Sequence, residues 1–143
     1  MSQDLFRETL GQQSAAPAVL LPDGWPALLI LDDDLTLLKT LVCFFEKRGF
    51  HVAAARSLEE AKVYYQRRRA WALVMSDFHL PDGTGAEFAG WIREQSGTPP
   101  PFLLTSGSAQ GVDKCTDEEF LAKPFGLQDL DRRVSELLRR HRT

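Results

Sequence analysis

Short runs of aliphatic residues alternate with amphipathic segments from residue 26 onward. The runs predict strands at 27–31, 51–54, 72–76, 101–104 and 119–122. Between and after them, apolar residues at helical spacing predict helices over 35–48, 58–68, 84–95 and 127–140. Because apolar residues in the strands are consecutive rather than alternating, both faces of the sheet should be covered. The pattern predicts an α/β fold with a five-stranded parallel sheet and helices on both faces.

The first 25 residues follow a different pattern. Leu5, Phe6 and Leu10 could line one side of a short helix, but glycine and several prolines then interrupt any regular spacing. We interpret residues 1–25 as a tail or linker and residues 26–143 as one domain, which suits a chain of 143 residues.

Composition limits the partners and the cellular location that we expect. The formal net charge is -3, so no overall basic field would draw the chain directly to nucleic acid. Cys43 and Cys115 stand too far apart for a zinc motif or a disulfide framework. No run of about 18 apolar residues and no signal peptide is recognisable, so we expect a cytoplasmic location and no membrane contact.

Polar residues follow four of the predicted strands. They are Asp32, Asp33 and Asp34 after the first, Asp77 after the third, Thr105 and Ser106 after the fourth, and Lys123 after the fifth. The carboxyl ends of parallel strands meet at one edge of an open sheet, where ligands collect. We therefore expect these residues to form one site.

The acids of this group predict a metal. Asp34 opens the next helix and is expected to cap it. If Asp32, Asp33 and Asp77 crowd together, their repulsion raises their pKa values unless a divalent cation and Lys123 lie among them. Mg²⁺ prefers oxygen ligands and is commonly held by one or two carboxylates plus phosphate oxygens. The site is typical of phosphoryl transfer, in which positioning and charge neutralisation supply most of the catalysis.

Four segments carry a family resemblance. They are Ile30–Asp33, Met75–Gly83, Leu103–Gly107 and Leu121–Phe125, in this order at strand ends. With them, residues 26–143 resemble the receiver domains of two-component response regulators and are similar to the chemotaxis regulator. The resemblance implies a doubly wound, flavodoxin-like sheet with strand order 2-1-3-4-5.

The resemblance also implies the roles of the acids. Asp77 would accept a phosphoryl group from a histidine kinase or a histidine phosphotransfer protein. Asp33, Asp77 and the backbone carbonyl of His79 would ligate Mg²⁺, with Asp32 acting largely through water. As a carboxylate nucleophile, Asp77 would form an acyl phosphate. The chain would then be no enzyme in the usual sense, because it would catalyse only its own phosphorylation and dephosphorylation.

The other half of the resemblance concerns phosphoryl binding and switching. Thr105, Ser106 and Lys123 would contact the phosphoryl group, and a cis bond before Pro124 would set the turn after the lysine. In the family, the hydroxyl moves toward the phosphoryl group and an aromatic side chain, here Phe120, fills the space. Because Phe120 has no phenolic hydroxyl, its inward position buries no polar group, and we expect it to lean inward before phosphorylation. The alternatives are a strand-ending turn at 105–106 and a simple core role for Phe120.

One departure from the family affects output. Seventeen residues separate Thr105 from Lys123, roughly a helical turn fewer than usual, and Gly107 and Gly111 lie among them. We expect a short, frayed or missing fourth helix, which leaves dimerisation through that helix in doubt. The arginines at the end suit a helix C-terminus. Output should therefore come from an unknown downstream protein, or the chain is a piece of a larger protein.

A rival interpretation comes from another class. Asp32, Asp34 and Thr36 also match the first motif of haloacid-dehalogenase phosphatases, with Asp32 as nucleophile and Asp34 as general acid. That interpretation lacks an acidic pair downstream of Lys123 and gives Asp77 no role. A flavodoxin-like binding module and a receiver without phosphorylation are further alternatives. The position of the phosphate distinguishes the receiver from the phosphatase, since a receiver carries it on Asp77 and the phosphatase on Asp32.

Overall fold

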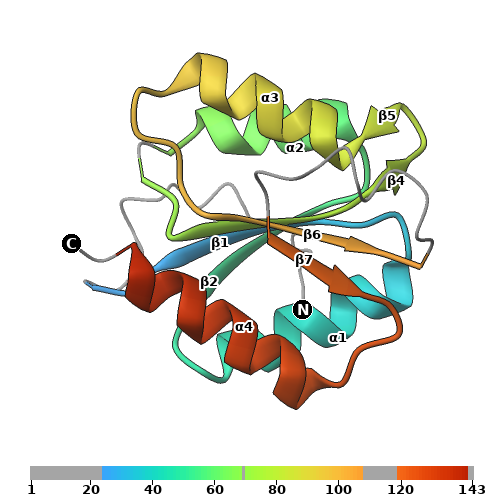
Figure 1. The fold of residues 1–143 in the computed structure, drawn as a ribbon, viewed down its shortest axis with the longest axis vertical. Coiled ribbons are helices and arrows are strands. Elements are labelled where there is room, and N and C mark those ends of the chain that lie inside the picture. The colour runs from blue at the N-terminus through green and yellow to red at the C-terminus, as the bar shows by residue number, and fades with distance from the viewer. Residues whose placement is uncertain (1–23, 69, 108–118, 142–143) are drawn as a thin grey trace.

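A computed structural model describes residues 24–68, 70–107 and 119–141 of the chain, and in it a parallel sheet lies between two pairs of helices (Figure 1). The sheet strands are β1 (Ala27–Leu31), β2 (His51–Ala55), β3 (Leu73–Asp77), β6 (Phe102–Ser106) and β7 (Glu119–Ala122), in the order β2-β1-β3-β6-β7. The helices are α1 (Leu35–Glu46), α2 (Leu58–Gln66), α3 (Gly85–Gln95) and α4 (Leu127–Arg140). Numbered within the sheet alone, the order is 2-1-3-4-5, which confirms the predicted fold class.

Two strands of the site extend further than the sequence predicts. β3 runs to Asp77 and β6 to Ser106, so Asp77 and Thr105 lie within the sheet rather than after it. The reason is that parallel pairing continues to this level, with Asp77 opposite Thr105. A two-stranded hairpin of β4 (His79–Leu80) and β5 (Gly83–Thr84) was not predicted, because strands of two residues carry no periodic pattern.

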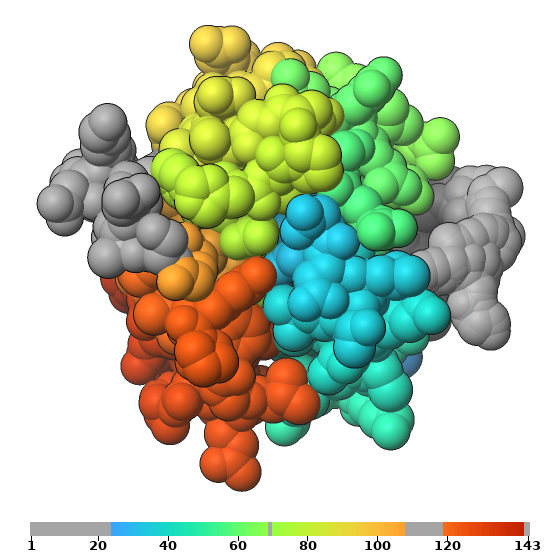
Figure 2. All heavy atoms as spheres, turned by 90° about the vertical axis from the view of Figure 1, so that its right-hand side faces the viewer, coloured from blue at the N-terminus to red at the C-terminus, as the bar shows by residue number. Residues whose placement is uncertain are grey.

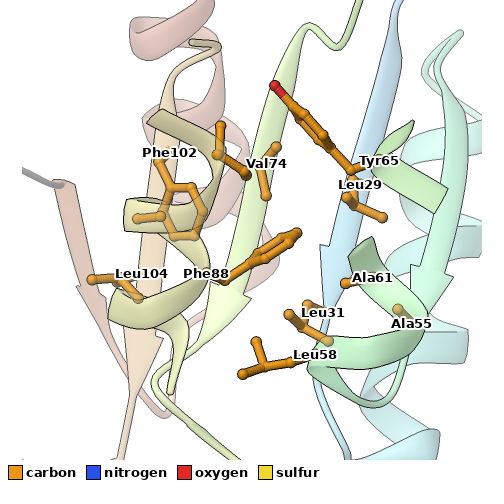
Figure 3. Packing of buried hydrophobic residues seen from close by; sticks show 12 residues of the cluster. Leu29, Leu31, Ala55, Leu58, Ala61, Tyr65, Val74, Phe88, Phe102 and Leu104 are labelled. Atoms are coloured by element: carbon orange, nitrogen blue, oxygen red, sulfur yellow. The ribbon is translucent and has the colours of Figure 1, made fainter. Parts of the chain in front are cut away.

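Each face of the sheet has its own apolar core. In β1, Leu29 and Leu31 face α2 and α3, whereas Leu28 and Ile30 face α1 and α4. All four are buried, which explains the unbroken apolar run of this strand. Figure 3 shows the α2/α3 side, where the side chain of Phe88 lies in the middle of this cluster. Two buried faces hold the strands rigidly and so fix the residues at their ends.

Local capping explains where several helices begin. Asp34 accepts a hydrogen bond from the backbone N–H of Leu37 and begins α1, as predicted. Ser57 accepts a hydrogen bond from the N–H of Glu60 and begins α2, and the Glu60 carboxylate accepts one from the N–H of Arg56, the residue before the cap. The polar residues before these helices therefore set their first turns.

Two predictions fall on parts of the chain outside the description. The tail predicted over residues 1–25 lies there except for its last two residues, of which Trp25 places its ring centroid 5.0 Å from that of His51. The short fourth helix was expected within 108–118, which also lies outside the described residues. In the described ranges, no helix has the length and apolar character needed to cross a membrane.

Candidate functional site

The polar residues singled out in the sequence gather at the edge of the sheet where the strands end. Figure 2 shows this edge, toward which β6 and β7 point in Figure 1 and where the blue, yellow-green and orange parts of the chain meet. Backbone hydrogen bonds extend the strand pairing to this level, from the N–H of Asp32 to Ala55 O (3.0 Å) and from the N–H of Lys123 to Ser106 O (2.8 Å). The backbone of the site is thus held by the sheet.

Three carboxylates form the acidic part of the site. One oxygen from each of Asp32, Asp33 and Asp77 lies within 4.8 Å of the others. Asp32 and Asp77 are buried and Asp33 is exposed. Hard divalent cations prefer such oxygen ligands, and solvent on the Asp33 side gives room for bound water. The donor set therefore fits a divalent cation of the Mg²⁺ type.

Lys123 links the two buried acids. Its Nζ lies 2.8 Å from Asp32 Oδ2 and 3.5 Å from Asp77 Oδ2. The other oxygen of Asp32 accepts a hydrogen bond of 2.9 Å from the backbone N–H of Asp34. Both oxygens of Asp32 are thus engaged, and a single ammonium group offsets the charge of two carboxylates.

The pKa values of this group respond to burial and to charge. Burial raises the pKa of Asp77, the Asp32 charge raises it further, and Lys123 opposes both effects. Burial would lower the pKa of Lys123, but its hydrogen bond and charge interactions with Asp32 and Asp77 outweigh burial and leave the pKa raised. Lys123 therefore stays protonated, while Asp77 ionises less readily than a free carboxyl.

Thr105 brings a second kind of group to the site. It lies opposite Asp77 in the next strand, and its Oγ1 is buried without a hydrogen-bond partner among the described residues. Buried hydroxyl groups are nearly always hydrogen-bonded, so an unpaired one beside the acids can serve an oxygen-rich ligand such as a phosphoryl group. Ser106, the last residue of β6, is also buried.

The remaining predicted residues lie around this centre. Phe120 is half-buried and packs against the α2/α3 cluster, next to Leu104 in the neighbouring strand. His79 lies in β4, two residues after Asp77, and its side chain is exposed. The Lys123–Pro124 bond is cis, as expected. The switch role of Phe120 and the ligand role of the His79 carbonyl stay predictions.

Two residues that support Asp77 were not identified from the sequence. The Ser76 hydroxyl donates a 2.8 Å hydrogen bond to the carbonyl oxygen of Asp77. At Gly85, the first residue of α3, a Cβ atom would lie 2.5 Å from the same oxygen and 2.9 Å from Ser76 Oγ. Only glycine lets α3 begin this close to the acceptor strand. Its sequence signal was a glycine at a helix start, where capping residues or proline are more usual.

Asp82 lies within the segment Met75–Gly83 that carries the family resemblance, but the sequence alone assigns it no role. Its carboxylate accepts hydrogen bonds from the backbone N–H groups of Leu58 and Glu59 at the start of α2. The sequence shows only an acid before a glycine, a pattern typical of a turn. Nothing in that pattern indicates a hydrogen bond to Leu58, 24 residues earlier.

Comparisons with known proteins agree with this geometry. A family model described as Response regulator receiver domain matches residues 28–135. Transcriptional regulatory protein BasR of Escherichia coli (strain K12) is 35% identical over 121 residues, which cover 80% of this chain and 53% of that protein. KDP operon transcriptional regulatory protein KdpE of the same organism is 30% identical over 119 residues, covering 80% of this chain and 52% of that protein. The chain spans about half the length of these two relatives.

Solved structures show the same fold. The non-phosphorylated HemR receiver domain from Leptospira biflexa is 30% identical, with a TM-score of 0.71 over 79% of this chain and 94% of that chain. A two-component response regulator from Clostridium difficile is 24% identical, with a TM-score of 0.75 over 82% of this chain and 99% of that chain, a likeness of fold alone. The family model, the relatives among transcriptional regulators and the fold all agree. The chain therefore belongs to the response regulator receiver domain family.

Proposed function

We propose that this receiver domain accepts a phosphoryl group on Asp77 in a Mg²⁺-dependent reaction. The observation that carries the proposal is the position of Lys123, whose ammonium group lies between the buried carboxylates of Asp32 and Asp77 at the edge of the sheet. An ion pair that only stabilised the fold would need one acid, and the second is expensive to bury. A site that receives a phosphoryl group needs both the nucleophile and the opposing cations.

Each residue has a chemical role in this proposal. A carboxylate oxygen of Asp77 attacks the phosphorus of a phosphohistidine, the acyl phosphate bond forms, and the P–N bond to the imidazole breaks. Mg²⁺, when bound, would neutralise charge on the transferred group. Asp33, Asp77 and the carbonyl of His79 would hold it directly, and Asp32 largely through water.

On the opposite side, three residues would contact the phosphoryl oxygens. Lys123 offsets their charge, the Thr105 hydroxyl donates a hydrogen bond, and Ser106 is small enough to let its backbone N–H approach. Movement of Thr105 toward the phosphoryl group would leave space that Phe120 fills. The half-buried position of Phe120 supports this switch, because the side chain packs against the α2/α3 cluster without being fully covered.

The partners follow from the chemistry and from the relatives. A histidine kinase or histidine phosphotransfer protein would supply the phosphoryl group, since receivers take it from phosphohistidine. The matched relatives are named as transcriptional regulators, and this chain spans about half of their length. We propose that residues 26–143 form the receiver and that output passes to a downstream protein, with residues 1–25 as a tail or linker.

The phosphatase alternative has less support. It needs Asp34 as a general acid, but the carboxylate of Asp34 is exposed and caps α1. It also leaves Asp77 without a role, although Asp77 belongs to the acidic group and contacts Lys123.

Phosphorylation with a small donor tests the proposal. Acetyl phosphate with Mg²⁺ should add one phosphoryl group, which intact-mass spectrometry detects and peptide mapping assigns to Asp77. Asp77→Asn should abolish the label, because an amide is neither a nucleophile nor an anionic ligand. Asp34→Asn is the matched control, since it also removes an acid from the site edge and should label normally. Label that persists in Asp77→Asn, or that maps to Asp32, would contradict the proposal.

A further inference from the structure

The loop after Asp77 is tied to the start of α2 through Asp82. Its Oδ1 accepts a 2.8 Å hydrogen bond from the backbone N–H of Leu58, and its Oδ2 accepts one of 3.1 Å from that of Glu59. The first N–H groups of a helix have no partner within the helix. A carboxylate from another loop therefore completes the N-terminus of α2, and these two bonds hold the pKa of Asp82 below its usual value.

The same helix also has a cap from its own chain segment. Ser57 Oγ accepts a 3.2 Å hydrogen bond from the N–H of Glu60, and the Glu60 carboxylate accepts from the N–H of Arg56. These contacts span three or four residues, whereas Asp82 and Leu58 are 24 residues apart. Asp82 thus does something Ser57 does not, because it joins α2 to the loop that leads away from the phosphoryl acceptor.

Close packing reinforces this connection. Gly83 has a φ of 153°, and a Cβ atom there would collide with Cδ1 of Leu58. Leu58 is itself buried in the α2/α3 cluster, which also includes the side chain of Leu80 at its border. The backbone of Gly83 therefore lies close against Leu58, and the two hydrogen bonds of Asp82 hold the loop to α2.

The tied loop carries the predicted backbone ligand. In the β4–β5 hairpin, His79 pairs with Thr84 and Leu80 with Gly83, so Asp82 lies in the turn that joins the two strands. At the base of the hairpin, the N–H of Gly85 donates a 2.8 Å hydrogen bond to the carbonyl of Phe78. The N–H of Phe78 donates a 2.7 Å hydrogen bond to the carbonyl of Thr105 in β6, so the sheet holds the base of the hairpin. With its turn held by Asp82, the hairpin keeps the backbone of His79 in one place.

We propose that Asp82 is a positioning residue of the metal site, which holds the His79 carbonyl in place by fastening the hairpin to α2. This inference rests on the proposed Mg²⁺-dependent phosphorylation. Coupling between two sites is reciprocal. Metal binding should therefore also steady the N-terminus of α2, where Leu58 and Glu59 donate to Asp82.

A pair of variants separates positioning from helix stability. Asp82→Ala and Ser57→Ala each remove a cap of α2 and should lower the melting temperature by about 3–5 °C. Isothermal titration calorimetry should show Mg²⁺ affinity roughly 10-fold weaker in Asp82→Ala, as for other residues that orient metal ligands. In Ser57→Ala the affinity should stay within about 2-fold of wild type, because the hydroxyl of Ser57 bonds to Glu60 in α2 and not to Asp82.

Amide hydrogen exchange supplies a second readout. In the wild type, Mg²⁺ should slow exchange at Leu58 and Glu59, and in Asp82→Ala this protection should be absent at equal Mg²⁺ saturation. If Asp82→Ala does not fold, Asp82→Asn keeps one acceptor oxygen and should show an intermediate loss of affinity.

The outcomes distinguish this inference from the proposed function. Wild-type affinity in Asp82→Ala, or equal weakening in Asp82→Ala and Ser57→Ala, overturns the positioning role and leaves phosphorylation of Asp77 intact. A wild-type protein that binds no Mg²⁺ overturns the proposed function, and the positioning role fails with it.

Discussion

The two halves of the site differ in how their polar groups are satisfied. The acidic half, which consists of Asp32, Asp33 and Asp77, comes from β1 and β3, and Lys123 offsets its buried charge at 2.8 and 3.5 Å. The other half, which consists of Thr105 and Ser106 at the end of β6, is called the phosphoryl half after the role proposed for it. In it, Thr105 Oγ1 is buried without a hydrogen-bond partner among the described residues.

This difference indicates where stability is given up for function. Lys123 compensates for two carboxylates that would otherwise repel each other, so it serves both halves. A buried hydroxyl without a partner costs on the order of 1–3 kcal/mol. The unpaired hydroxyl of Thr105 therefore lowers the stability of the fold. This loss is expected if the hydroxyl serves to bind a phosphoryl oxygen, as proposed above, and not to stabilise the fold.

Removal of the link between the halves should have the largest effect. Lys123→Met should slow phosphorylation by acetyl phosphate roughly 100-fold, because it deletes a charged donor from the phosphoryl group. Lys123 also lowers the pKa of Asp77, so its loss raises that pKa. Since the nucleophile is the ionised carboxylate, the fall in rate on the acid side should begin at a higher pH than in wild type.

Rates of phosphorylation measured across the acid range check this shift. Lys123→Arg keeps the positive charge and should leave the acid side of the profile close to that of wild type. An acid side that is the same in Lys123→Met and in wild type would show that the ammonium does not act on Asp77.

Substitutions within the acidic half should have intermediate effects. Asp33→Asn should weaken Mg²⁺ binding roughly 30-fold and Asp32→Asn roughly 10-fold, since a direct ligand contributes more than one that acts through water. Calorimetric titration measures both values. Asp34→Asn should bind as wild type does, because that carboxylate caps α1. Equal losses in the first two variants would remove the distinction between direct and water-mediated ligands.

The smallest effect is expected in the phosphoryl half. Thr105→Val should raise the free energy of unfolding by about 1 kcal/mol, because it replaces an unpaired buried hydroxyl with a methyl group of similar size. Urea unfolding without Mg²⁺ measures the change. Thr105→Ser keeps the hydroxyl and should show no gain. A less stable Thr105→Val protein would indicate that the hydroxyl is satisfied and that the contrast between the halves is not real.

Local patterns in the sequence determined much of the architecture. The buried run of β1 and the helical spacing of α1 carried their own signals, and Asp34 and Ser57 marked helix starts through contacts of three residues. The order of elements then placed Asp32, Asp77 and Lys123 at one edge, because parallel strands all end there. The candidate site could therefore be predicted from position along the chain alone.

Only the tertiary structure decided how those residues meet. Lys123 contacts Asp32 across 91 residues of sequence, and Asp82 caps a helix that begins 24 residues before it. Gly85 fits at the start of α3 because the carbonyl oxygen of Asp77 in β3 would lie 2.5 Å from a Cβ atom there. Hydrophobic spacing and capping act over a few residues and can therefore be recognised in the sequence. Other features depend on how separate elements pack, which no local pattern encodes. They are the side-chain distances across the sheet, the close contact at Gly85 and the unpaired hydroxyl of Thr105.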